Sequence, residues 1–320
     1  MVPPASRLLA RSALVLMALF GLAWPPGAYG QALPDPSRQE TRPSARDSAR
    51  AALAAAVRAL PPGVETRRTL PRTALLAGNV AAGAGLTAGR ALAEGVPARR
   101  LPGAALAGAA TGAAFYAAKA TVGEGHPVAG FALAYAATSL AENAAEGRHV
   151  LSHVRLGLGP LDVRVATPLA RRDGTLRPTP GVAFEIEPVS VAAAVVLPLQ
   201  GFRPRPCRAG LCYRSDEPML IERDGRRYRR VGRAGGRVVR LWPPHTARTE
   251  AHEGIHVIQS MQVAAATPRG TLRTLLGADT DATLAADVRV DWLTALAGAG
   301  LARIPYRRQW TEREAFTLAR

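Results

Sequence analysis

Hydrophobic and polar positions change their spacing along the chain and divide it into regions of different expected structure. One region is rich in Ala and Gly, and its apolar runs are separated by Pro and Gly, a pattern typical of tightly packed helices. Gly85 with Gly89, and Gly108 with Gly112, have the four-residue spacing that lets helix backbones touch. The pattern predicts a helical hairpin region. Its runs are residues 72–95, 101–120 and 126–147.

The same region has a second interpretation, because two of its runs are almost free of charge. Residues 101–118 and 126–141 contain no Asp, Glu, Lys or Arg and are nearly long enough to span a bilayer. Lys119 and Glu124 lie at the turn between them. Ala and Gly transfer only weakly into lipid, so we favour a soluble hairpin with an interface of small residues. A membrane hairpin through residues 101–141 is the alternative.

The middle of the chain has the pattern of β-strands. The runs 153–168 and 181–199 are rich in β-branched side chains between Pro and Gly, which predicts strands in both. Asp224 and Gly225 stand between two extended runs, a strong hairpin signal. Residues 237–242, "RVVRLW", predict a last strand stopped by two prolines. This strand is expected either at the edge of a sheet beside the helix that follows, or as an ordinary strand within a sheet.

After the two prolines the spacing becomes helical again. Thr246 or Thr249 is placed to cap a helix in which Ile255, Ile258 and Met261 recur at helical intervals. One or two further helices are expected after a Pro-Gly break, and a final helix in the last ten residues.

Together these patterns predict an α+β fold with a central antiparallel β region between two helical regions. The N-terminal residues resemble a secretory signal peptide, because Arg7 and Arg11 precede a short apolar run that ends in small residues before Gln31. The expected organisation is a signal peptide at 1–30, a linker with a short helix at 31–70, an Ala/Gly-rich helical region at 71–148, a β-rich region at 149–244 and a helical region at 245–320.

A cleaved signal peptide implies an exported protein, which is periplasmic, in the cell envelope or secreted. In such an oxidising compartment Cys207 and Cys212 are expected to form a disulfide that closes a small loop.

The formal net charge of +17 adds little to the expected function. Basic residues are scattered with few aromatic residues between them, so the sequence does not predict a specific nucleic-acid site. Association with an anionic membrane or envelope surface is the weaker alternative. Lys119 is the only lysine, and such a bias towards Arg indicates compositional drift more than selection for a partner.

The stretch "HEGIH" carries the clearest chemistry in the chain. His252 and His256 are four residues apart on an expected helix, so their imidazoles project from one face and can share a metal ion. Glu253 lies beside them, where it can take a proton from a water that the metal activates.

A third ligand is expected from the final helix. "TEREAF" offers Glu312 and, as the rival, Glu314. These residues resemble the gluzincin group of zinc metallopeptidases, in which a glutamate on a later helix, commonly in a Glu-x-x-Ala-Asp setting, completes the His-Glu-x-x-His site. The resemblance implies that His252, His256 and Glu312 bind Zn²⁺. "HEGIHVIQ" is also similar to helices of poorly characterised exported bacterial peptidase-like domains, and the likeness covers about residues 238–320.

The sequence departs from the family pattern at Phe316, where gluzincins usually have an aspartate that orients a metal-bound histidine. Another acid would then have to supply that contact. The candidates are Asp279, Asp281, Asp287 and Asp291. Tyr306 and His245 are candidates for stabilising a developing oxyanion, although a structural role is more common for such residues.

The resulting hypothesis is an exported zinc-dependent metallopeptidase that hydrolyses peptide bonds in a peptide or protein substrate. The alternative is a non-enzymatic envelope protein, structural or interacting, that keeps a remnant metal-binding helix and associates with a membrane. The sequence predicts neither the cleavage preference nor the oligomeric state.

Overall fold

The computed structural model describes residues 70–158, 161–169, 182–186, 188–207, 210–223, 226–267, 286–288 and 309–319. The expected signal peptide and the short helix of the linker lie outside the described residues. So do the one or two helices expected after the Pro-Gly break, except for residues 286–288.

The described chain has an α+β fold, as predicted. Its helices are α3 (Arg72–Ala93), the short 3-10 helix η1 (Ala98–Arg100), α4 (Leu101–Gly123), α5 (Pro127–Ala145), α6 (Pro188–Leu199), α7 (Ala247–Ala264) and α10 (Trp310–Leu318). Its strands are β1 (His153–Leu158), β2 (Leu161–Ala166), β3 (Val182–Ile186), β4 (Arg203–Cys207), β5 (Gly210–Arg214), β6 (Met219–Arg223), β7 (Arg226–Arg230), β8 (Gly232–Gly235), β9 (Val238–Leu241) and β10 (Ala286–Val288).

Glycines bring α3 and α4 into backbone contact. A methyl group on Gly112 would overlap the carbonyl oxygen of Asn79, and one on Gly83 would lie 2.8 Å from the Cα atom of Gly112. The predicted pair Gly108 and Gly112 is therefore confirmed as an interface. The prediction for Gly85 and Gly89 is wrong, because both are exposed and nothing lies within 4 Å of the position of a Cβ atom. Their spacing is right, but they occupy the outer face of α3.

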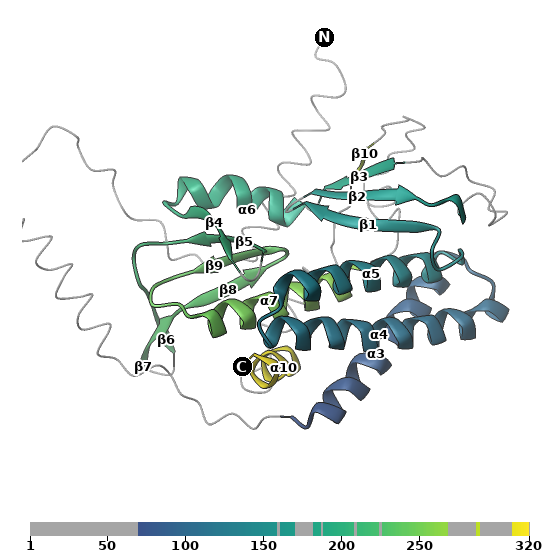
Figure 1. Ribbon diagram of the computed structural model, residues 1–320, viewed down its shortest axis with the longest axis horizontal. Helices are drawn as coiled ribbons and strands as arrows, with labels where there is room; N and C mark the ends of the chain where they lie inside the picture. Colours follow the sequence, from purple (N-terminus) through teal and green to yellow (C-terminus); the bar gives the residue numbers. More distant parts are fainter. Residues whose placement is uncertain are drawn as a thin grey trace, which may run out of the picture. The chain divides into compact units, whose positions relative to one another are not determined.

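The helix α7 lies at the centre of the main core. It packs against β8 and β9 and also against α4, α5 and α10 (Figure 1). Apolar side chains from all these elements except β8 are fully or almost fully buried together, so the Ala/Gly-rich helices and the motif helix share one core. The largest of them are Phe115, Leu241, Ile255, Ile258, Met261 and Leu318.

The sheet beside α7 has the strand order β4-β5-β9-β8. The hairpins β4–β5, β8–β9 and β6–β7 are antiparallel, but β5 and β9 are parallel. The sheet is therefore mixed, whereas we expected antiparallel strands. "RVVRLW" forms β9 in the interior of this sheet, so the first of its two expected positions, at the edge, is wrong. Among the described strands β8 is at that edge, and it contacts α7.

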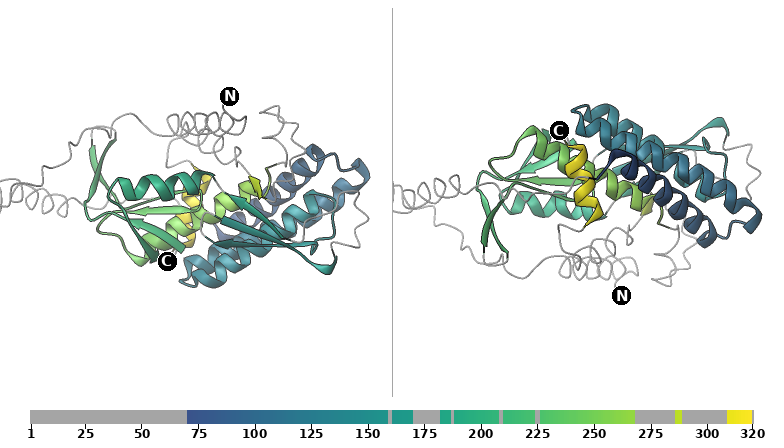
Figure 2. Two further views of the ribbon diagram at one scale, coloured as in Figure 1. Left: turned by 90° about the horizontal axis from the view of Figure 1, so that it is seen from above. Right: turned by 90° about the horizontal axis from the view of Figure 1, so that it is seen from below.

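The apolar run 181–199 forms a strand and then a helix, and the prediction of strands throughout is wrong for its second half. Pro188 opens the twelve-residue helix α6, in which three consecutive alanines favour helix over strand. Leu197 of α6 is buried against Tyr213 and Val238. In Figure 2 α6 lies over the strands of this sheet. In Figure 1 it lies on the face of the sheet opposite to α7.

A second sheet has the order β1-β2-β3-β10, and β1 packs against α5. The strand β10 pairs in parallel with β3. The prediction of a purely helical C-terminal region is therefore wrong at residues 286–288. Arg155 of β1 is 3% exposed and pairs with Glu142 of α5 at 3.1 Å and with Asp162 of β2 at 2.8 Å. Arg237, in the turn between β8 and β9, also pairs with Asp162 and so connects the two sheets.

Two predictions about the environment of the protein, export and a possible contact with a membrane, are confirmed only in part. Cys207 and Cys212 are joined by a disulfide across the β4–β5 hairpin, as predicted, which indicates an oxidising environment. By length and composition, the helical stretch Ala98–Gly123 is apolar enough to cross a membrane. A third of its most apolar window is buried in the fold, and core helices of soluble proteins meet the same criterion.

We expect Gly112→Ala to destabilise the protein, because the added methyl group would force α3 away from α4. The cost of such overpacking is about 1–3 kcal/mol. Gly89→Ala is the matched control in the same helix pair. It should stabilise the protein by about 0.5–1 kcal/mol, because alanine loses less backbone entropy in a helix. Urea unfolding of both variants tests this. Equal effects would show that the helices do not touch at Gly112.

Candidate metal centre

The motif histidines lie on the second and third turns of a well-capped helix. The Thr246 side chain accepts a hydrogen bond from the backbone N–H of Thr249, and the Thr249 side chain accepts one from the backbone N–H of Thr246. This capping fixes the start of α7. His252 and His256 then project from one face, with ring centroids 4.8 Å apart.

Glu312 of α10 completes the pair of histidines. The two Nε2 atoms of His252 and His256 are 3.1 Å apart, and the Glu312 oxygens lie 3.4 Å and 3.5 Å from them. Ligand atoms around a tetrahedral zinc ion are about 3.3–3.5 Å apart, given zinc–ligand bonds of about 2.0–2.2 Å. The three residues therefore already have the spacing that one metal ion requires, and the carboxylate spans both histidines.

Gln259 sets the tautomer of His256. The side-chain amide nitrogen of Gln259 donates to the carbonyl oxygen of Thr311 and to Glu314, which can only accept. Its oxygen therefore faces the Nδ1 atom of His256, 2.7 Å away, and Nδ1 must be the donor. In the neutral ring Nε2 then carries a lone pair that points towards His252 and Glu312.

The Nε2 atoms of His252 and His256 and the carboxylate of Glu312 thus converge on one point. Burial alone would lower the pKa of His256, but its hydrogen bond to Glu312 and the charges of Glu312 and Glu253 raise the pKa to about 9. Burial would raise the pKa of Glu312, but hydrogen bonds from His252 and His256 lower it well below its usual value. A proton or a metal ion can supply positive charge at that point, so the donor set fits a divalent metal.

Glu314, the rival third ligand, has a different position. It is 1% exposed and pairs with Lys119 of α4, with Nζ and Oε2 2.9 Å apart. Asn79 of α3 donates to its other oxygen at 2.5 Å and accepts from Lys119 at 2.5 Å. Burial lowers the pKa of Lys119, and the charge of Glu314 raises it. Glu314 therefore supports Gln259 from behind the site while Glu312 faces the histidines.

This network gives the Nδ1 atom of His256 an acceptor, although position 316 is a phenylalanine and not an acid. The acceptor for its Nδ1–H is the Gln259 amide, itself held by Glu314. Phe316 packs on the ring of His252, with centroids 4.1 Å apart. Among the expected acids, Asp279, Asp281 and Asp291 lie outside the described residues, and Asp287 is described only as part of the backbone of β10.

Glu253 lies between the histidines and the sheet. Its side chain is buried, and burial, with the charge of Glu312 adding to it, raises its pKa to about 7. His256, the backbone N–H of Ala234 and Arg230 act in the opposite direction. The carboxylate lies so close to β8 that a methyl group on Gly232 would be 2.6 Å from its oxygen. A carboxylate with a pKa near neutrality can both accept and donate a proton at pH 7.

The prediction of Tyr306 and His245 as oxyanion residues stays a prediction. His245 lies beside Glu250, with Nε2 4.0 Å from the nearer oxygen, and Tyr306 lies outside the described residues.

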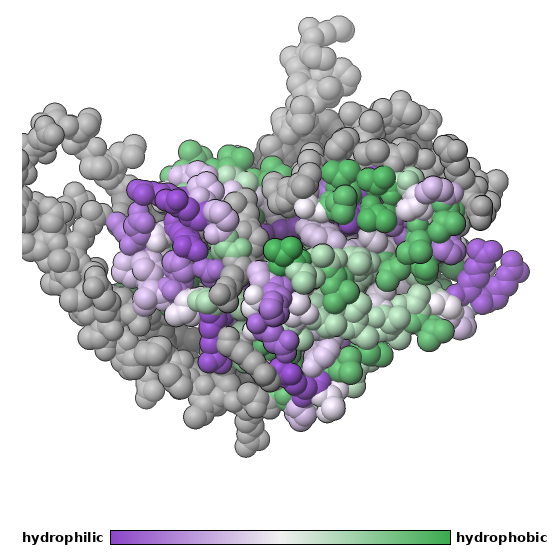
Figure 3. All heavy atoms as spheres, viewed as in Figure 1, coloured by the Kyte–Doolittle hydropathy of each residue, from purple (hydrophilic) through white to green (hydrophobic). Residues whose placement is uncertain are grey.

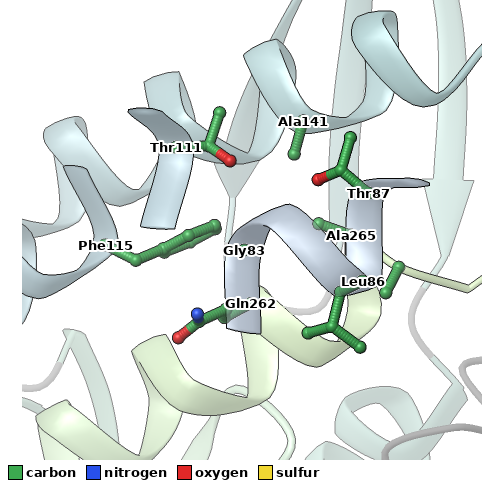
Figure 4. A pocket seen from close by; sticks show the side chains of 9 residues that line it. Gly83, Leu86, Thr87, Thr111, Phe115, Ala141, Gln262 and Ala265 are labelled. Atoms are coloured by element: carbon green, nitrogen blue, oxygen red, sulfur yellow. The ribbon is translucent and has the colours of Figure 1, made fainter. Parts of the chain in front are cut away.

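A small cavity lies between helices of the core (Figure 4). It is enclosed by α3, α4, α5 and α7, with Phe115, Thr87 and Thr111 on its walls. Gln262, which accepts from Lys119 at 3.1 Å, also borders it. The cavity has no contact with Glu253, so we do not assign it to the substrate.

Sequence reasoning missed the roles of Asn79, Lys119 and Glu314 as supports of His256. One signal was present: Lys119 is the only lysine and stands between two runs without charge. A single cation in such a context is expected to have a buried partner. The identity of that partner could not be read from the sequence, because it lies 195 residues away.

Comparisons with known proteins add no assignment. No protein-family model matches the chain, and neither the curated proteins nor the solved structures contain a significant match.

We expect Gln259→Leu to weaken binding of a divalent metal about 10- to 100-fold, because His256 would lose the acceptor that orients it. Ser260→Ala, one residue further along α7, is the control and should bind as the unchanged protein does. Competition with a chromophoric chelator measures the affinity, and circular dichroism shows whether α7 persists. Equal affinities in both variants would mean that Gln259 does not support the site.

Proposed function

We propose that the protein is a zinc-dependent metallopeptidase of the gluzincin type. The observation that carries this proposal is the spacing of His252, His256 and Glu312, which matches the ligand spacing of one tetrahedral metal, with Glu253 beside them. Two histidines and one carboxylate form the ligand set of catalytic zinc in peptidases, and it leaves a fourth position for substrate.

Zinc, when bound, would supply Lewis acidity that polarises a carbonyl group and lowers the pKa of water. The chain supplies the proton carrier. Glu253 would accept a proton as the attacking water adds to the peptide carbonyl and would pass it to the leaving amine. Its raised pKa suits both steps, because the group exchanges protons readily near pH 7. Gln259 would keep His256 in the tautomer that offers Nε2 to the metal.

The edge of the sheet at β8, which no other described strand covers, supports a peptide as the substrate. The backbone N–H of Trp242 donates to the carbonyl oxygen of Val231, so residues 231 and 242 form a hydrogen-bonded pair. Antiparallel ladders alternate, which turns the polar backbone groups of Gly232 and Ala234 away from β9 and towards the edge. The N–H of Ala234 reaches Glu253 there. An extended peptide added to this edge would therefore pass the proposed base.

An exported location belongs to the same proposal, supported by the Cys207–Cys212 disulfide. A non-enzymatic envelope role is the competing function. The apolar side chains of Leu106 and Val128, 75% and 84% exposed, favour contact with a membrane or another protein. Zinc binding without cleavage of any peptide would support this alternative.

The central test compares Glu253→Gln with His256→Ala. Glu253→Gln should keep zinc and lower kcat about 10²- to 10⁴-fold, because it removes the proton carrier alone. His256→Ala should lose zinc and activity together. Zinc content by mass spectrometry and cleavage of a broad peptide library measure both. If the unchanged protein holds zinc no more tightly than His256→Ala, the proposed site is wrong.

Gly232→Ala should lower kcat while zinc stays bound, because the new methyl group would displace the Glu253 carboxylate. Gly235→Ala in the same strand is the matched control, since nothing lies within 4 Å of a Cβ atom there. Peptide hydrolysis and zinc content are measured for both. Equal activity of the two variants would argue against β8 as a wall of the active site.

A further inference from the structure

Positive charge is concentrated in the strands β7 to β9, and the edge strand β8 contacts the proposed base. Residues 226–240 contain seven arginines and no acidic residue. Figure 3 shows hydrophilic side chains gathered over the end of the molecule where the sheet β4-β5-β9-β8 lies. Within this segment Arg237 pairs with Asp162, whereas Arg230, Arg233 and Arg240 interact electrostatically with Glu253.

Arg233 and Arg240 are direct cross-strand partners in the β8–β9 hairpin. Like charges directly opposite one another destabilise a sheet. Both side chains are half-buried, and burial together with the neighbouring arginines lowers the pKa of Arg240 to about 10 and also lowers that of Arg233. Within the described part of the chain no ion pair joins Arg233 to a carboxylate. The only acidic charge that acts on both pKa values is that of Glu253, which has its own role.

The strand alternation places both guanidinium groups on one face of the sheet. Val239 and Leu241 face the core around α7, whereas Val238 packs with Leu197 of α6. Arg240 therefore projects on the face of Val238, and its partner Arg233 projects on the same face. The guanidinium carbon of Arg240 lies 5.9 Å from the centre of the Trp242 ring, which restricts its position.

A peptide strand beside β8 would place every second side chain on this face, next to Arg233. We propose that Arg233 and Arg240, with Arg230, bind a carboxylate of the substrate, so that the preferred substrate is an acidic peptide. The carboxylate comes from an acidic side chain near the scissile bond or from the C-terminus of the peptide. This inference rests on the proposed peptidase function and names its substrate class.

The test uses four versions of each library peptide. Glu or Gln stands at one position, and the C-terminus is a free acid or an amide. Binding to zinc-loaded Glu253→Gln is measured by fluorescence polarisation, and kcat/KM is measured with the unchanged protein. We expect about 10- to 100-fold tighter binding of the acidic version, the range for a charge-assisted hydrogen bond. A preference for Glu over Gln identifies a side chain, and a preference for acid over amide identifies the C-terminus.

Variants of the arginines show which side chains produce the preference for an acidic peptide. Arg233→Gln and Arg240→Gln, each combined with Glu253→Gln, should abolish the discrimination, and Arg233→Lys should retain part of it. Arg205→Gln, on the far edge strand of the same sheet, is the control and should change nothing. Thermal unfolding is a second readout: Arg233→Gln should unfold at the same or a higher temperature, because it removes a like-charge contact.

The outcomes separate this inference from the proposed function. Cleavage without charge preference overturns the inference and leaves the function. Acid-selective binding that depends on Arg233, without cleavage of any peptide, keeps the inference and overturns the function. Equal binding of all four versions, no binding, or discrimination that survives Arg233→Gln overturns the inference. So does Arg233-dependent binding to phosphatidylglycerol vesicles in place of peptides, which would assign the cluster to an anionic surface.

Discussion

The buried ion pair between Lys119 and Glu314 is the interaction on which the candidate metal centre depends. Each side chain is 1% exposed, so neither charge can be hydrated by bulk water. Removing one partner of such a pair costs about 3–5 kcal/mol, because the other charge is left buried without compensation. Asn79 and Gln262 satisfy further hydrogen-bonding positions of the pair. The pair is thus tolerable only when α3, α4, α7 and α10 are all in place, and the same contacts hold Gln259 against His256.

Charge is arranged differently on the two sides of the motif helix. Behind the histidines Lys119 and Glu314 form an ion pair. Side-chain hydrogen bonds from or to Asn79, Gln259 and Gln262 complete this network. On the other side the pKa values of Glu253 and His256 are raised, and that of Arg240 is lowered by burial and by the neighbouring arginines. Shifted pKa values of this kind are common where a protein binds ligands.

The elements that were predicted correctly are those that short stretches of sequence determine. The cap at Thr246, the hairpin turn after Arg223, the cysteine pairing and the helix of Glu312 each depend on residues close together in sequence. The errors arose where tertiary packing decides. The run after Pro188 can form a strand or a helix, and burial of Leu197 against the sheet fits the helix. The edge position belongs to β8 because β9 pairs with β5 as well, a contact that no local pattern indicates.

At the metal centre the ligands could be predicted, but their support could not. His252, His256 and Glu312 follow from a spacing and a family resemblance, whereas the partner of Glu314 follows from contacts with residues 195 and 235 positions earlier. This difference has a consequence for how the site forms. Contacts over such separations join distant parts of the chain, so the orientation of His256 depends on the whole fold and not on the motif alone. A fragment with "HEGIH" and "TEREAF" alone would contain His252, His256 and Glu312. It would lack Asn79 and Lys119, which hold Glu314 and thereby orient His256 through Gln259.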